Sequence, residues 1–162
     1  MPIDLAEDGG KLMIKVIHPI SGTIAFLMIT VFWISTLWVE LLGTQTQVIA
    51  VKMTIPYGLL VLIPAMIAVS GSGFRIAGGR NGGLIGTKAR RMRVIAANGV
   101  LVLVPSALFL AWKAQTGALD TSFYTVQVIE LMSGALNLTL LGQSMRDGLQ
   151  LKGRFRRKPA RA

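Results

Sequence analysis

The sequence has no cysteine and only one histidine. Without cysteine, the chain can form no disulfide, no thiolate nucleophile and no cysteine-ligated metal centre. Acidic residues are also few: 7 Asp and Glu stand against 17 Lys and Arg, which gives a net charge of +10. Charges of either sign are almost missing from four long stretches of the chain. These four stretches indicate the class of protein.

The four stretches are apolar over nearly their whole length. They cover residues 16–39, 53–74, 94–112 and 121–145. A helix needs about 20 mostly apolar residues to cross the hydrocarbon core of a bilayer. We therefore expect an all-α integral membrane protein with four transmembrane helices in an antiparallel bundle. The expected helices are about 16–42, 53–74, 94–113 and 122–146, in a single domain of residues 1–150 that precedes a basic cytoplasmic tail at 151–162.

The segments that flank and connect these stretches alternate between many and few basic residues. The segments before the first stretch, between the second and third, and after the fourth hold 15 of the 17 Lys and Arg. The two other connecting segments hold only Lys52 and Lys113. Lys and Arg in short loops favour the cytoplasmic side of a membrane. We therefore predict that both termini are cytoplasmic, and that the protein is a multi-pass protein of the bacterial cytoplasmic (inner) membrane.

The basic segments are also candidates for contact with lipid head groups or with a partner protein. A Lys or Arg close to an anionic membrane surface is attracted by about 1 kcal/mol. The candidate residues are Arg75, Arg80, Lys88, Arg90, Arg91, Arg93, Arg154, Arg156 and Arg157. Because membrane topology accounts for the positive charge, we expect no nucleic-acid partner. The expected partners are anionic membrane lipids and other membrane-protein subunits or a second copy of the chain.

Polar residues within the last stretch predict an inward face. Gln127, Glu130 and Asn137 follow the spacing of one helix face. A charge inside a membrane costs at least a few kcal/mol, so Glu130 is a candidate functional residue. We expect Lys52 or Lys113 to pair with it, and Gln127 could donate a hydrogen bond to it. The alternatives are ordinary helix packing and, for Glu130, an interfacial carboxylate that faces outer water.

A second polar cluster is expected near the cytoplasmic side. At about 1.5 Å of rise per residue, Asn98 and Gln143 lie at the depth of His18. These three residues could form a polar pocket open to the cytoplasm. The alternative is that His18 simply bonds to a neighbouring helix.

The segment His18-Pro-Ile-Ser-Gly22 resembles the start of a haem-ligating first helix. The helix count is that of small bacterial four-helix b-type cytochromes. The resemblance implies haem b with His18 as an iron ligand. Those cytochromes usually carry histidines on several helices, whereas the other three stretches here have none. No metal site and no other cofactor is expected.

The sequence offers no catalytic set. The glycine-rich segment before Lys88 lacks the order Gly-Lys-Ser/Thr of a phosphate-binding loop. An enzyme is therefore not the favoured interpretation. We expect an accessory or assembly subunit of a larger membrane complex. Two alternatives stay open: a transporter or a lipid- or quinone-binding bundle that uses Glu130 and Asn137, and a haem-binding redox protein that uses His18.

Overall fold

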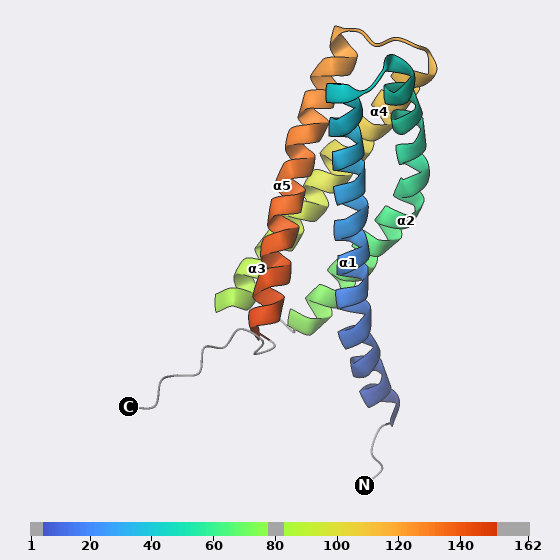
Figure 1. Ribbon diagram of the computed structural model, residues 1–162. Coiled ribbons are helices and arrows are strands. Elements are labelled where there is room, and N and C mark those ends of the chain that lie inside the picture. Colours follow the sequence, from blue (N-terminus) through green and yellow to red (C-terminus); the bar gives the residue numbers. More distant parts are fainter. Residues whose placement is uncertain (1–4, 78–82, 152–162) are drawn as a thin grey trace.

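The protein is a bundle of long helices (Figure 1). The computed structural model describes residues 5–77 and 83–151. The elements are α1 (Leu5–Leu42), α2 (Gln45–Ala77), α3 (Gly83–Asn98), the π-helical turn η1 (Gly99–Leu103), α4 (Val104–Gln115) and α5 (Thr121–Leu151). Within the described residues, four segments are long and apolar enough to cross a membrane: Val16–Leu42, Gln45–Gly73, Ala89–Gln115 and Thr121–Leu149. The expected all-α bundle of four candidate transmembrane helices is therefore confirmed.

The helices pack in a closed ring. α1 packs along α2, α2 along α4, α3 along α5, and α5 returns to α1. The first turn of α1 and the last turn of α5 lie at the same end of the bundle (Figure 1). We call this the basic end, because Arg75, Arg91 and Arg146 lie there. The opposite end, with the connections 43–44 and 116–120, is called the loop end.

The start of α2 differs from the expectation. The helix begins at Gln45, well before residue 53, because Thr44 and Gln47 cap it reciprocally. The Gln47 N–H donates to Thr44 Oγ1 (3.4 Å), and the Thr44 N–H donates to Gln47 Oε1 (2.8 Å). Such a capping box satisfies two backbone donors at a helix start. Lys52, which interrupts the apolar stretch and was expected in an outer loop, lies inside α2.

The third span is helical throughout but changes its winding. In η1, the Val104 N–H donates to the Gly99 carbonyl, five residues back. Pro105 follows Val104. Proline has no N–H, and in a regular α-helix its ring would collide with the carbonyl four residues earlier. The wider π turn relieves that collision. Residues 83–93, which were expected in a connecting loop, form the first turns of α3.

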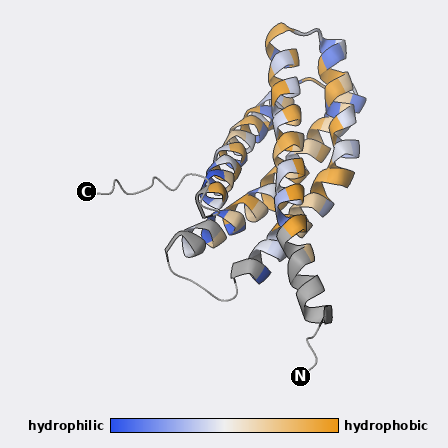
Figure 2. Cartoon of the chain, turned by 60° about the horizontal axis from the view of Figure 1, so that its bottom comes forward, coloured by the Kyte–Doolittle hydropathy of each residue, from blue (hydrophilic) through white to orange (hydrophobic). Residues whose placement is uncertain are grey.

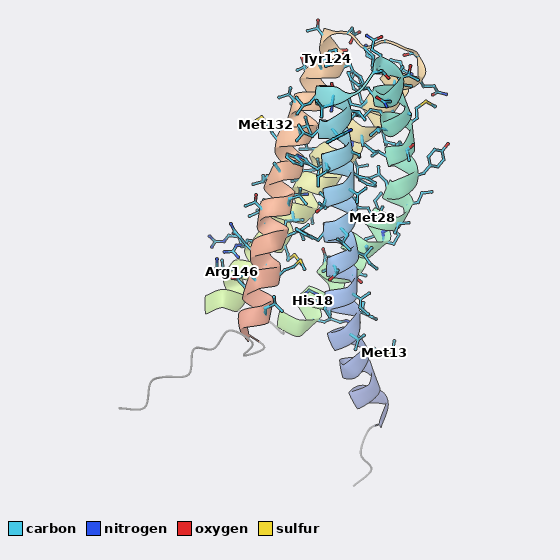
Figure 3. The ribbon with its side chains drawn as sticks, in the orientation of Figure 1. Met13, His18, Met28, Tyr124, Met132 and Arg146 are labelled. Carbon is cyan, nitrogen blue, oxygen red and sulfur yellow. The ribbon has the colours of Figure 1, made fainter. Side chains whose placement is uncertain are left out.

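Hydrophobic residues predominate along the helices (Figure 2), and many of them are exposed whereas several polar residues are buried. Leu60 and Met132 are exposed by 73% and 71%, whereas Lys52 and Asn137 are exposed by only 0% and 1%. Figure 3 shows Met132 and Met13 projecting away from the bundle. In a soluble protein large apolar side chains are mostly buried, because exposing so much apolar surface to water is unfavourable. The distribution is suited to lipid, which leaves polar groups to face other helices.

Candidate functional site

The most unusual residue in the bundle is Lys52 of α2, whose side chain is 0% exposed. Its ammonium group donates to Glu130 Oε2 on α5 and lies 3.4 Å from Thr36 Oγ1 on α1. At 1.5 Å per residue, Lys52 lies about 10 Å below the first residue of α2. An unpaired charge at such a depth costs several kcal/mol, so each member of the pair needs the other. Three helices are thereby joined at one buried point.

Of the two lysines expected as partners of Glu130, the structure selects Lys52. Lys113 instead pairs with Asp120, with its Nζ 2.6 Å from Asp120 Oδ2 at the loop end. The expected hydrogen bond from Gln127 to Glu130 does not form, because neither polar atom of the Gln127 side chain has a hydrogen-bond partner. Glu130 is not an interfacial carboxylate in open water, since its side chain is only 13% exposed.

Two further polar side chains lie one turn nearer to the loop end. Glu40 follows Thr36 by one turn of α1, and Gln127 precedes Glu130 by one turn of α5. Glu40 Oε1 and both polar atoms of Gln127 are buried without a hydrogen-bond partner. Glu40 also interacts electrostatically with Lys52.

We call this group the Lys52 cluster. Its members are Thr36, Glu40, Lys52, Gln127 and Glu130. It contains two carboxyl groups and one ammonium group, so the cluster is negative by one charge when all three are ionised. One bound proton would make it neutral.

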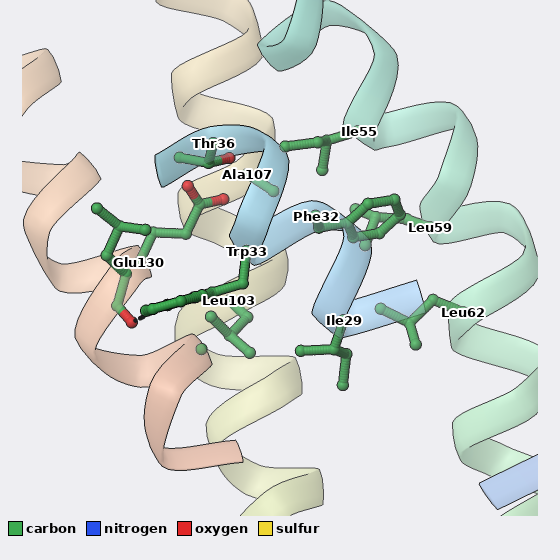
Figure 4. Close-up of a pocket in the computed structure, with 12 residues that line it drawn as sticks. Ile29, Phe32, Trp33, Thr36, Ile55, Leu59, Leu62, Leu103, Ala107 and Glu130 are labelled. Atoms are coloured by element: carbon green, nitrogen blue, oxygen red, sulfur yellow. Dashed lines mark hydrogen bonds between the residues drawn. The ribbon is translucent and has the colours of Figure 1, made fainter. Parts of the chain in front are cut away.

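A small cavity adjoins the cluster (Figure 4). Its volume is about 60 Å³, and Thr36 and Glu130 contribute the polar part of a wall that is otherwise apolar. The Trp33 indole lies along another side, where its N–H donates to the Leu131 carbonyl (2.9 Å). One water molecule needs roughly 10–15 Å³ of such space, and drug-sized ligands need about 300 Å³ or more. The cavity therefore suits a few water molecules or a similarly small occupant.

Asn98 of α3 and Asn137 of α5 are hydrogen-bonded to each other within the bundle. The Asn98 amide donates to Asn137 Oδ1 (2.9 Å) and to the Ser133 carbonyl (2.9 Å). The Asn137 amide in turn donates to the Ile95 carbonyl (3.4 Å). These bonds connect α3 to α5 beside the π turn, where backbone carbonyls deviate from the regular helical pattern. Asn137 therefore contributes to helix packing and does not line the cavity.

His18 and Gln143 are directed to different places. His18 Nδ1 lies 3.1 Å from the Val69 carbonyl and 3.0 Å from Ser72 Oγ, both on α2. The ring also packs closely against Gly73. Gln143 is exposed on α5, in a groove between α1 and α5. His18, Asn98 and Gln143 thus have separate partners, and haem ligation by His18 stays a prediction.

Several of the basic candidates lie on helices. Arg91 of α3 pairs with Asp147 of α5, Nη1 to Oδ2 at 2.5 Å. Arg75, Arg90 and Arg93 are exposed at the basic end. The remaining candidates have no described side chain: Arg80, Arg154, Arg156 and Arg157 lie outside the described residues, as does the side chain of Lys88.

Sequence reasoning missed the role of Glu40 and the depth of Lys52. A signal for Lys52 was present, because the apolar residues Val48, Ile49 and Val51 precede it. They extend the apolar stretch toward the loop end and place the lysine inside a helix. No comparable signal identified Glu40, which lies near a helix end and becomes part of the cluster only through its neighbours.

Within the described part of the chain, no three His, Asp or Glu side chains converge on a possible metal site. Comparisons with protein-family models, with curated proteins and with solved structures find no match. Function must therefore be inferred from the residues of this chain and their geometry.

Proposed function

We propose that this protein is a small proton-coupled transport bundle of the bacterial cytoplasmic membrane, in which the Lys52 cluster takes up and releases a proton. The observation that carries the proposal is a buried ion pair beside a cavity, accompanied by buried polar atoms that have no partner in the chain. Glu130 is the operative carboxyl group, because it both pairs with Lys52 and lines the cavity.

A purely structural ion pair would be arranged differently. Buried polar networks stabilise a fold only when every member is satisfied, and a buried ion pair is often no more stable than apolar residues of the same size. Here Glu40 and Gln127 are left with unsatisfied atoms. These atoms need water, a proton or a small solute to complete their hydrogen bonds. Unsatisfied buried atoms destabilise the folded protein. Their presence is explained if the cluster binds and releases such an occupant.

The proposed orientation has both chain ends and the basic end in the cytoplasm. The exposed arginines at that end support it, because Lys and Arg in short segments favour the cytoplasmic side. The Lys52 cluster then lies in the outer half of the membrane. Reporter fusions at residues 82 and 118 check this orientation: a cytoplasmic reporter is expected to be active only at residue 82. The reverse pattern would refute the orientation.

The accessory-subunit interpretation stays a prediction. In the sequence it rests on the missing catalytic set, and the polar stripe on the last helix offered a surface that could face a partner. Gln127 and Asn137 of that stripe are 3% and 1% exposed within the chain. A partner would therefore have to contact a different, outward surface of the bundle.

The proposal is tested by proton flux into proteoliposomes that enclose a pH-sensitive dye, driven by a potassium diffusion potential. Wild-type protein should acidify the interior faster than protein-free liposomes. The Lys52→Met/Glu130→Leu double variant should lose this flux and still fold, because apolar replacements of both partners are well tolerated. Size-exclusion chromatography checks its folding.

The matched control is the Lys113→Met/Asp120→Asn variant, which removes an ion pair at the loop end outside the cluster. It should conduct like the wild type. A wild-type flux equal to that of empty liposomes would refute the proposal. So would an undiminished flux in the folded Lys52→Met/Glu130→Leu variant.

A further inference from the structure

We propose that the groove between α1 and α5 binds one anionic phospholipid, with its phosphate at Arg146 and an acyl chain along the groove. This site is separate from the proposed proton-coupled function, because it opens on the outside of the bundle near the basic end. The occupant is inferred from the shape of the groove and from the charge at one of its ends.

The groove has a volume of about 550 Å³. Its apolar part is formed by Phe26 and Ile34 of α1 and by Leu138 of α5. A Cβ atom added to Gly142 would meet nothing within 4 Å, so the α5 side of the groove is open at this point. The absence of a side chain there leaves space for a flexible chain between the two helices.

The hydroxyl groups in the groove are already satisfied. Thr30 Oγ1 donates to the Phe26 carbonyl (2.7 Å), and Thr139 Oγ1 donates to the Ala135 carbonyl (2.8 Å). These bonds stay within each helix and need no partner from outside. The middle of the groove therefore suits a ligand without hydrogen-bonding groups, such as a hydrocarbon chain.

The polar end of the groove is formed by Gln143 and Arg146. Arg146 lies at the basic end of α5 (Figure 3). Among the described residues no carboxylate pairs with Arg146, and the adjacent Asp147 is engaged by Arg91. The guanidinium group offers paired donors in a geometry that matches phosphate. Leu138 lies about 12 Å further into the span. A cation at one end of an apolar groove is complementary to an anionic phospholipid, whose head group would lie at the cation and whose acyl chain would extend along the groove.

Charge also favours a lipid over a second copy of the chain. A twofold contact on this face would place the same surface of both copies together. It would bring the two Arg146 side chains and the two basic ends near each other, and like charges repel. An anionic lipid instead neutralises Arg146. A zwitterionic lipid does so less well, because its head group has no net charge.

The test uses Trp33, which is one of the residues that line the groove. In a Trp38→Phe/Trp112→Phe background, Trp33 is the only tryptophan. This protein is reconstituted in phosphatidylcholine vesicles that contain a small fraction of lipid brominated on its chains. Brominated phosphatidylglycerol should quench Trp33 more than the same fraction of brominated phosphatidylcholine. Arg146→Gln should abolish the difference. Arg93→Gln, which removes an exposed charge at the same end, should retain it.

A second pair of variants tests the groove itself. Gly142→Leu fills the groove and should also abolish the preference for phosphatidylglycerol. Gly71→Leu on α2 is the control, because a Cβ atom there also meets nothing within 4 Å. Equal quenching by the two lipids would overturn the proposal, as would a preference that survives both Arg146→Gln and Gly142→Leu. A dimer in detergent that Gly142→Leu converts to monomers would assign the groove to a second copy and would also overturn it.

Discussion

Gly58 of α2 lies directly against the ring of Phe32 of α1, and a Cβ atom on the glycine would overlap ring atoms Cζ and Cε1. Glycine therefore lets the two helices approach closely, as small residues do in membrane bundles. Thr36 lies one turn further along α1 from Phe32. The Gly58–Phe32 contact thus helps to set how near α1 comes to Lys52.

Replacing Gly58 by alanine should destabilise the bundle by about 1–3 kcal/mol, because the added methyl group forces the Phe32 ring or a helix to move. Unfolding in mixed detergent micelles measures the change. Gly71→Ala is the matched control on the same helix, since its methyl group would meet nothing within 4 Å. Equal stability of the two variants would show that the close approach at Gly58 is unimportant.

The two asparagines near the π turn should be energetically coupled. Asn98→Ala and Asn137→Ala each remove the hydrogen bond between them, so a double-mutant cycle should give a coupling energy of about 0.6 kcal/mol, typical for bonds between membrane helices. Each asparagine also donates to one backbone carbonyl, Asn98 to that of Ser133 and Asn137 to that of Ile95. Asn137→Ala should have the larger single effect, because Asn137 is only 1% exposed. Strictly additive losses would contradict a direct bond.

The Arg91–Asp147 pair should tolerate an exchange of its partners. Asp147→Asn leaves Arg91 without its carboxylate and should cost at most about 1 kcal/mol, since both side chains are partly exposed. The Arg91→Asp/Asp147→Arg double variant keeps the net charge of the basic end and should recover most of the loss. Thermal unfolding of the wild type and of these two variants at low salt provides the measurement. Failure of the exchange to restore stability would mean that the surroundings are matched to one orientation.

Asp120 should make the loop end sensitive to acid. The Lys113 ammonium group, the Ser122 hydroxyl and the Phe123 N–H bond to the Asp120 carboxylate and hold its pKa well below the usual range. A lowered folded-state pKa stabilises the fold at neutral pH, and this contribution is lost as the pH falls from about 4 through the folded-state value. Asp120→Asn should therefore lower the melting temperature at pH 7 and have less effect in strong acid.

The same site gives a second readout. Because Lys113 is the largest cause of the shift, Lys113→Met should raise the pKa of the Asp120 carboxyl toward its usual value. An NMR titration of the carboxyl carbon measures this directly. An unchanged pKa in Lys113→Met would show that the helix cap alone accounts for the shift.

Helix ends were harder to predict than helices. The expected start of the second helix at residue 53 was wrong because a lysine was taken as the end of an apolar stretch. Thr44 and Gln47 form the actual boundary, and Lys52 is accommodated because Glu130 reaches it from α5. The sequence around Lys52 does not show that a partner lies on another helix. A single charged residue beside an apolar stretch could therefore belong either to a loop or to the buried interior.

The sequence by itself determined that four apolar helices form this protein, because the length of an uncharged stretch and the distribution of Lys and Arg are local properties that lipid and water act on directly. Only the tertiary structure decided which polar groups meet. The pairing of Lys52 with Glu130, the separate positions of His18 and Gln143, and the unsatisfied atoms of Glu40 and Gln127 all depend on how each helix is rotated and which neighbour it contacts. Those rotations result from packing between side chains far apart in the chain, such as Phe32 over Gly58 and Trp33 beside Gly134.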